Sequence, residues 1–175
     1  CGSGILDVVA EMKSANIMDE RGAIIKGKMN IRPGTKNKLE FLLVPREHTG
    51  HGRDIDVSRT DVNEIHLAKA ALRAGQEILI AKAGIEAADI DEIIIAGAFG
   101  TYIDVPNAIS VGMFPDIPLQ RFRQVGNAAG MGAMQALISG RHRKLIKDVI
   151  KDVEYVELTT YENFQREFVE AMYLR

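Results

Sequence analysis

The chain has a single cysteine, Cys1, and no tryptophan among its 175 residues. One cysteine excludes a disulfide within the chain. It also excludes a zinc or iron–sulfur centre held by a cluster of this chain's cysteines. Any redox chemistry in which the chain takes part therefore has to reside in another domain or another protein.

The common phosphate-binding motifs are missing as well. The sequence has no Gly-x-x-x-x-Gly-Lys-Ser/Thr run. It also has no Gly-x-Gly-x-x-Gly after a strand with an acidic residue about twenty positions later. These absences exclude a P-loop enzyme and a simple Rossmann domain.

The chain has no excess of charge of one sign. Lys and Arg total 22 against 24 for Asp and Glu, which gives a formal net charge of -2. This balance provides no electrostatic reason to expect nucleic acid or an anionic membrane as a partner. No apolar run approaches the roughly 18 residues of a transmembrane helix, and no basic-then-apolar leader is present. We therefore expect a cytoplasmic protein with no nucleic acid and no membrane among its partners.

The residues that are present fit one α/β domain. With 46% hydrophobic residues the chain can bury one good core, so we expect residues 1–175 to form a single domain. Because the sequence opens on Cys1 and not on Met, we expect this domain to be a piece of a larger protein. Short apolar runs between residues 24 and 57, the first of them at Ile24 and Ile25, are separated by turn residues and predict a small β meander.

Residues 61–82 predict a long amphipathic helix, with Asp61 and Glu64 in capping-box spacing and Gly84 as its C-terminal cap. The run Ile93-Ile94-Ile95-Ala96 is wholly apolar, which is typical of a strand buried on both faces. Two more strands are expected at residues 123–125 and 155–158, and further helices over residues 104–111, 128–136, 145–153 and 164–172.

Three glycine-rich turns each join an apolar segment or open a helix: Gly2-Ser3-Gly4, Gly97-Ala98-Phe99-Gly100, and Gly126-Asn127 before a helix of small residues. The N-terminus of a helix offers unpaired N–H groups and partial positive charge, and glycine lets a ligand approach the backbone. One such turn is more often only a turn. Three in one chain shift the balance modestly toward a phosphate or ribose site.

The order of these motifs resembles the second half of the actin/sugar-kinase/Hsp70 superfamily, in which the turn after the buried strand contacts adenosine. Four segments are similar in sequence to the reductive activators of corrinoid proteins: residues 58–69, 95–104, 107–118 and 125–133. These activators are ATPases that return inactive cob(II)alamin to cob(I)alamin in methyltransferase systems. The resemblance covers nearly the whole chain.

The resemblance implies an α/β, ribonuclease-H-like lobe with a mixed central sheet, helices on both faces and a β insertion near residues 24–57. It also implies ATP with Mg in the intact protein, bound between this C-terminal lobe and another. Gly2, Ser3 and Gly4 would face the phosphates. The residues that would lie under the adenosine are Gly97, Ala98, Phe99 and Gly100. Asn127 would orient its turn or reach the ligand.

The same resemblance implies a corrinoid protein as partner, an iron–sulfur cluster in a domain outside this chain, and a homodimer. The acidic residues that hold magnesium and position water in the superfamily belong to the missing half. We therefore assign no catalytic residue and no metal ligand here, and we expect no robust ATP hydrolysis from this piece alone.

Two other functions remain open. In the first alternative the chain is a non-catalytic docking and dimerisation module for the corrinoid protein. In the second it is part of an activator for another low-potential acceptor such as a 2-hydroxyacyl-CoA dehydratase. By residue type Phe99 is a candidate for the core. His48 and His51 fit a solvated loop better than a metal site, and Lys69 and Arg73 are expected to face water.

Overall fold

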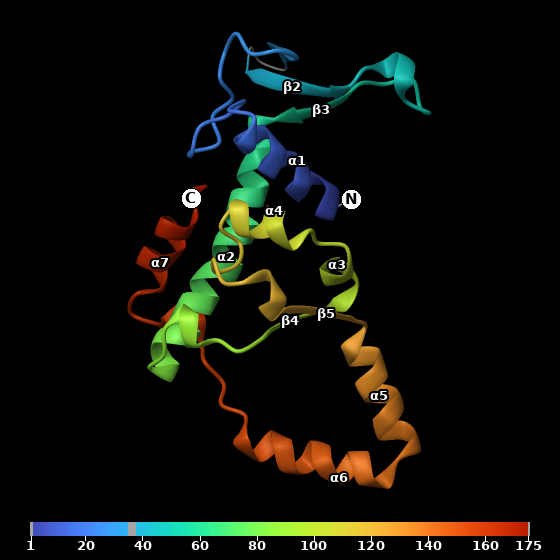
Figure 1. Cartoon of the computed structure of the whole chain (residues 1–175), viewed down its shortest axis with the longest axis vertical. Helices are drawn as coiled ribbons and strands as arrows, with labels where there is room; N and C mark the ends of the chain where they lie inside the picture. The colour runs from blue at the N-terminus through green and yellow to red at the C-terminus, as the bar shows by residue number, and fades with distance from the viewer. Residues whose placement is uncertain (1, 35–37, 175) are drawn as a thin grey trace.

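The structure, a computed structural model, describes residues 2–34 and 38–174. Figure 1 shows two sheets separated by helices. The strands are β1 (Ile31–Pro33), β2 (Leu39–Val44), β3 (Ile55–Ser58), β4 (Ile93–Ala96) and β5 (Phe122–Gly126). The helices are α1 (Gly2–Ser14), α2 (Arg59–Ala83), α3 (Gly97–Thr101), α4 (Val105–Ser110), α5 (Ala128–Ile138), α6 (Gly140–Val149) and α7 (Phe164–Ala171). No described helix is both long and apolar enough to cross a bilayer.

Helix α2 is the central element, and its limits follow from its caps. Ser58 is the N-cap: its hydroxyl accepts from the backbone N–H of Asp61, while the Asp61 carboxylate accepts from the Ser58 N–H at 2.8 Å. The capping box therefore uses Ser58 and Asp61, and the predicted pairing of Asp61 with Glu64 was wrong. Gly84 ends the helix in the left-handed conformation, as its position predicts.

The β insertion forms an antiparallel sheet in the order β1-β2-β3. Its predicted location is confirmed, but the strand expected at Ile24 and Ile25 was wrong. Ile24 makes only an isolated bridge to Met18. The positive φ angles of Gly22 and Gly27 turn the chain on either side, so the run is too short to extend a sheet.

Strands β4 and β5 form a parallel pair in which Ile93 lies opposite Phe122. The expectation that β4 is buried on both faces was wrong. Ile95 is 8% exposed, whereas Ile94 is 53% exposed because no described element of this chain covers its face. The strand predicted at residues 155–158 is not formed either. That segment pairs with no described strand and leads into a 3-10 turn.

The core lies between α1, α2, α4 and the start of β4. Leu6 and Val9 of α1, Val62 of α2 and Ala108 of α4 are fully buried. Packing of α7 along α2 adds a second layer, and Lys69 on α2 donates to the carbonyl of Tyr173 after α7. Lys69 is 1% exposed, so the expectation that it faces water was wrong: the C-terminal segment covers it.

His66 lies one turn before Lys69 and is 3% exposed. Burial, with a smaller contribution from repulsion by Lys69 and Arg59, lowers the pKa of His66 to about 4 against the opposing attraction of Asp19. Folding therefore favours the neutral imidazole, as expected for a histidine used in packing.

This burial predicts a stability loss in mild acid. The pKa of His66 is lower in the folded state than its ordinary 6.5, so its contribution is complete above about pH 6.5 and is lost as the pH falls toward 4. The loss should reach roughly 3 kcal/mol. Urea unfolding at pH 7 and pH 4.5 should show a smaller loss in His66→Gln than in the wild type. Equal losses in both proteins would contradict the assignment to His66.

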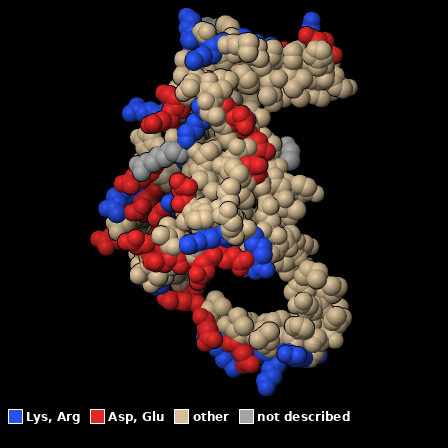
Figure 2. All heavy atoms as spheres, viewed as in Figure 1, with Lys and Arg blue, Asp and Glu red and all other residues tan. Residues whose placement is uncertain are grey.

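Helices α5 and α6 extend away from the body of the molecule, and Figure 2 shows an open space between them and the rest of the chain. Neither helix has a buried residue. Their large apolar side chains are exposed: Met131, Met134, Leu137, Ile138, Leu145, Ile146 and Val149. A surface of this kind is typical of one that is covered by another part of a protein or by a partner.

Candidate nucleotide site at the ends of the parallel strands

The second and third glycine-rich turns lie at one edge of the parallel sheet. Parallel strands end at the same edge, and Ala96 at the end of β4 lies opposite Gly126 at the end of β5. Helix α3 begins directly after β4, and α5 begins after Asn127. Figure 1 places the N-terminus of α1 on the same side of the molecule as α3 and the start of α5. Ligands of α/β proteins bind preferentially at such an edge.

The first two turns make contact through Gly2 and Phe99. A Cβ atom on Gly2 would lie 3.0 Å from Cε2 of the Phe99 ring, so a larger residue would push the ring away by a few tenths of an ångström. Phe99 is 48% exposed, and its assignment to the core was wrong. It presents a half-open aromatic face beside the start of α1. Ser3 is buried, whereas the Cβ position of Gly4 faces open space.

The two glycines of the second turn serve different purposes. Gly97 has a φ of +93° with open space around its Cβ position, so its backbone is accessible from outside. Gly100 faces inward, where an added Cβ would lie 2.5 Å from Cγ2 of Ile95. Ala98 lies between them in α3, which Thr101 closes by donating to the carbonyl of Gly97 at 3.0 Å.

Asn127 orients the third turn. Its side-chain oxygen accepts from the N–H of Gly130 at 2.9 Å, which makes it the N-cap of α5. This is one of the two roles predicted for it. Gly126 before it has a φ of +64° and approaches Thr101 of α3, with 3.8 Å between its Cβ position and the threonine Oγ1.

Gln124 on β5 was missed by the sequence reasoning. Its side-chain amide donates to the carbonyls of Gly100 and Ile103 at 2.7 and 2.8 Å, which fixes the second turn to the neighbouring strand. No spacing or motif marks this glutamine, because its partners are backbone atoms of a segment more than twenty residues away.

The described part of this edge lacks a metal-binding cluster. Across residues 2–34 and 38–174, no group of three or more His, Cys, Asp and Glu side chains is placed to hold a metal ion. Nearby, Asn107 of α4 donates to the Asp7 carboxylate of α1 at 3.0 Å. That pair holds α1 against α4, so it has a structural role.

An apolar groove of about 460 Å³ runs between α2 and β4 and includes Phe99 and Gly100. Its walls come mainly from Leu72 and Leu79 of α2 and from the isoleucines of β4. Gly2, Ser3, Gly4, Ala98 and Asn127 do not line it. The groove is thus an apolar neighbour of the glycine-rich edge, with few groups that can hydrogen-bond a ligand.

A family model described as the C-terminal domain of RACo, the ASKHA domain, matches residues 1–175. The chain belongs to this family. It is 37% identical over 172 residues to "Corrinoid activation enzyme RamQ" of Eubacterium limosum, covering 94% of this chain and 29% of that protein. It is 22% identical over 165 residues to "[Co(II) methylated amine-specific corrinoid protein] reductase" of Methanosarcina barkeri, covering 93% of this chain and 27% of that protein.

A solved structure, "Reductive activator for corrinoid,iron-sulfur protein", matches with a TM-score of 0.90 and 36% identity. The match covers 99% of this chain and 28% of that one. The predicted α/β lobe of ASKHA type and the resemblance to corrinoid activators are therefore confirmed. The chain spans less than a third of the length of the relatives it matches.

Proposed function

We propose that the chain is the C-terminal nucleotide-binding lobe of an ATP-dependent reductive activator that returns the cob(II)alamin of a corrinoid protein to cob(I)alamin. The observation that carries the proposal is the meeting of the start of α1, the Gly97 turn and the Gly126 turn at one sheet edge. The names of the relatives support the corrinoid acceptor over a 2-hydroxyacyl-CoA dehydratase.

The edge suits an adenine nucleotide in shape and in hydrogen-bonding groups. The open backbone at Gly97 and at Gly4 leaves space that a side chain would fill. The half-exposed ring of Phe99 offers an apolar surface for adenosine, and the N-terminus of α1 offers N–H groups and partial positive charge for phosphate. In this assignment Gly2, Ser3 and Gly4 lie toward the phosphates.

The chain's own contribution is binding. The described residues provide no cluster for magnesium, and the single cysteine excludes a cysteine-ligated iron–sulfur centre within the chain. We assign the magnesium ligands to the opposing lobe and the iron–sulfur cluster to another domain. ATP and ADP binding with different affinity to open and closed lobes would then bias the conformation, and only that difference can drive an uphill electron transfer.

The uncovered apolar helices support the view that this lobe works inside a larger assembly. The faces of α5 and α6 are exposed along their whole length, as is Ile94 of β4. We propose that the rest of the intact protein covers them, with a homodimer as the functional unit. The apolar groove beside Phe99 favours a second candidate, a docking module for the corrinoid protein without nucleotide binding.

Reduction of the corrinoid partner tests this function. With the intact protein carrying this chain, a strong electron donor and the corrinoid protein, we expect cob(I)alamin to accumulate with MgATP and not without nucleotide. Absorption spectroscopy of the corrinoid reports the change. Equal accumulation without ATP, at the same amount of activator, would overturn the ATP-driven function and favour the docking module.

A further inference from the structure

The β insertion, residues 24–57, has a charge opposite to that of the remainder of the chain. Seven of the 22 Lys and Arg residues and four of the 24 Asp and Glu residues lie in it, so it carries +3 and the remainder carries -5. In Figure 2 basic side chains stand out at the left end of the insertion, at the top of the view, and basic and acidic side chains lie together at its right end, while acidic side chains gather over the middle of the molecule.

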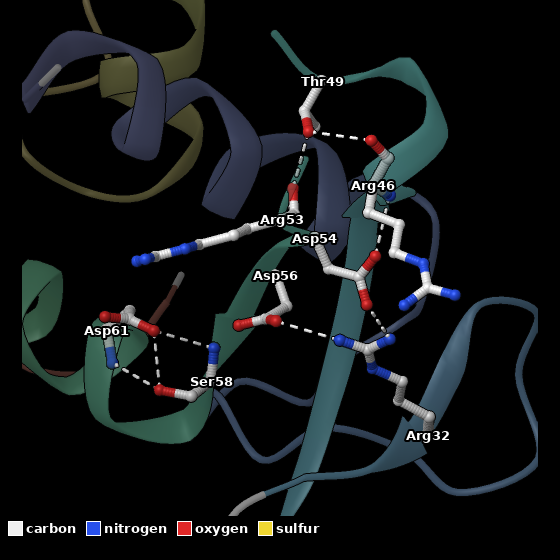
Figure 3. Close-up of polar contacts among 8 residues, drawn as sticks. All are labelled: Arg32, Arg46, Thr49, Arg53, Asp54, Asp56, Ser58 and Asp61. Atoms are coloured by element: carbon white, nitrogen blue, oxygen red, sulfur yellow. Dashed lines mark hydrogen bonds and ion pairs between the residues drawn. The ribbon is translucent and has the colours of Figure 1, made fainter. Parts of the chain in front are cut away.

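The two aspartates of the insertion share one arginine, so this cluster keeps a charge of -1 and the rest of the insertion carries +4. Arg32 contacts Asp54 at 2.5 Å and Asp56 at 3.0 Å, as Figure 3 shows. Asp54 also accepts from the backbone N–H of Arg46 at 2.8 Å. These hydrogen bonds hold the pKa of Asp54 below its ordinary value, so it remains ionised and paired.

The other described cations of the insertion lie outside the ion pairs of the described residues. Within the described residues, no ion pair holds the side chains of Arg46 and Arg53, and Figure 3 shows both guanidinium groups outside the network of dashed lines. Three exposed lysines are likewise outside the described ion pairs: Lys26, Lys28 and Lys38.

The turn that carries the two arginines is held in shape. The Thr49 hydroxyl lies 3.0 Å from the carbonyl oxygen of Arg46 and 2.8 Å from that of Arg53, which brings the two backbone segments together. The Arg53 N–H donates to Nδ1 of His51 at 3.2 Å. A turn fixed in this way presents its cations at little further cost in conformational entropy when a partner binds.

Apolar side chains accompany these cations. Met29 is 84% exposed and follows Lys28, and the carbonyl of the next residue, Asn30, accepts from the Leu42 N–H at 2.8 Å, which places this turn beside β2. Leu43 of β2 and Ile55 of β3 are also exposed. Methionine and arginine are enriched at the cores of protein interfaces, so this surface differs from a merely solvated face.

We propose that the β insertion is an electrostatic docking surface for an acidic face of the corrinoid protein. The inference rests on the proposed function and adds to it the element of the lobe that contacts the partner and the charge of the partner's face. Complementary charge accelerates association and selects the partner, while Met29, Leu43 and Ile55 supply the apolar contact. The chain as a whole is slightly acidic and would repel a nucleic acid, so an acidic protein surface fits the β insertion better than a nucleic acid does.

The test measures association of the intact protein with the corrinoid protein at low and high salt. Arg46→Glu with Arg53→Glu should lower the association rate at least about tenfold at low salt and weaken its salt dependence. Lys82→Glu with Arg166→Glu makes the same charge change at exposed positions of α2 and α7, outside the proposed interfaces, and should change the rate by no more than about twofold. Arg46→Lys with Arg53→Lys should bind nearly as the wild type does.

Three outcomes overturn the proposal. If both charge-reversed proteins bind equally well or equally poorly, the β insertion is not the docking surface, while the proposed function stands. If Arg46→Glu with Arg53→Glu instead disrupts self-association in sedimentation, the surface joins copies of this chain. If the wild type binds no corrinoid protein in any nucleotide state, the proposed function fails together with the docking surface. An unchanged ATP affinity of the variants, measured by calorimetry, controls for folding.

Discussion

Gly22→Val should destabilise the fold more than any other single substitution considered for this chain. Gly22 has a φ of +69°, and a Cβ there would lie 2.3 Å from Nη1 of Arg59, 2.6 Å from Cγ1 of Val62 and 2.8 Å from Cε1 of His66. Backbone strain and overpacking each cost about 1–3 kcal/mol, so we expect a combined loss of about 3–5 kcal/mol. Urea unfolding of the two proteins measures this loss.

Gly27→Val is the matched control for that substitution. Gly27 has a φ of +84°, but nothing lies within 4 Å of its Cβ position. It should therefore show only the backbone cost, roughly 1–2 kcal/mol. If the two variants lose the same free energy of unfolding, the close packing of the Gly22 turn over Arg59 and His66 contributes nothing.

Gly97→Val should abolish nucleotide binding by the intact protein while leaving it folded. The open space at Gly97 would be filled by the new side chain, directly beside the proposed adenosine surface. We expect the affinity for ATP to fall at least about a hundredfold, which corresponds to about 2.7 kcal/mol. Calorimetric titration with ATP, with and without magnesium, measures the change.

Gly27→Val again provides the control, because both glycines have positive φ angles and open surroundings, and only Gly97 lies at the candidate site. Their backbone strain is therefore comparable. If Gly97→Val binds ATP with the affinity of the wild type, the Gly97 turn is not part of the nucleotide site. A similar loss of affinity in both variants would assign the effect to strain.

The elements that were predicted correctly are those whose signals are local. The long helix ends at Gly84 as predicted, and the helix predicted from residue 104 begins there, with Asp104 as its N-cap accepting from the Asn107 N–H at 2.9 Å. Cap residues act within a turn of their own position, so spacing indicates where they lie, although it placed the N-cap of α2 at Asp61 and the structure places it at Ser58. Asn127 is a third example, since its partner is Gly130.

The errors concern properties that depend on distant segments. Ile94 has the residue type of a buried strand, but its exposure depends on what covers the sheet. Lys69 has the residue type of a surface cation, but the backbone of Tyr173 lies against it. Gln124 carries no signal in the sequence because its side-chain amide donates to the backbone carbonyls of Gly100 and Ile103, in the segment between β4 and β5. Sequence spacing carries little information about such contacts.

The candidate site was predicted as three separate turns, and the structure adds their spatial relation. The contact of Gly2 with Phe99 joins the first two turns, and the approach of Gly126 to Thr101 joins the second and third. Neither relation follows from any one motif. The nucleotide itself remains a proposal that rests on this geometry and on membership of the family.

Amide hydrogen exchange of the intact protein, with and without MgATP, tests the central claim most directly. We predict slower exchange on ATP binding in residues 2–4, 97–100 and 126–130, with residues 24–57 unchanged. ATP binding that slows exchange elsewhere and leaves all three glycine-rich turns unaffected would contradict the assignment of the nucleotide site to this edge.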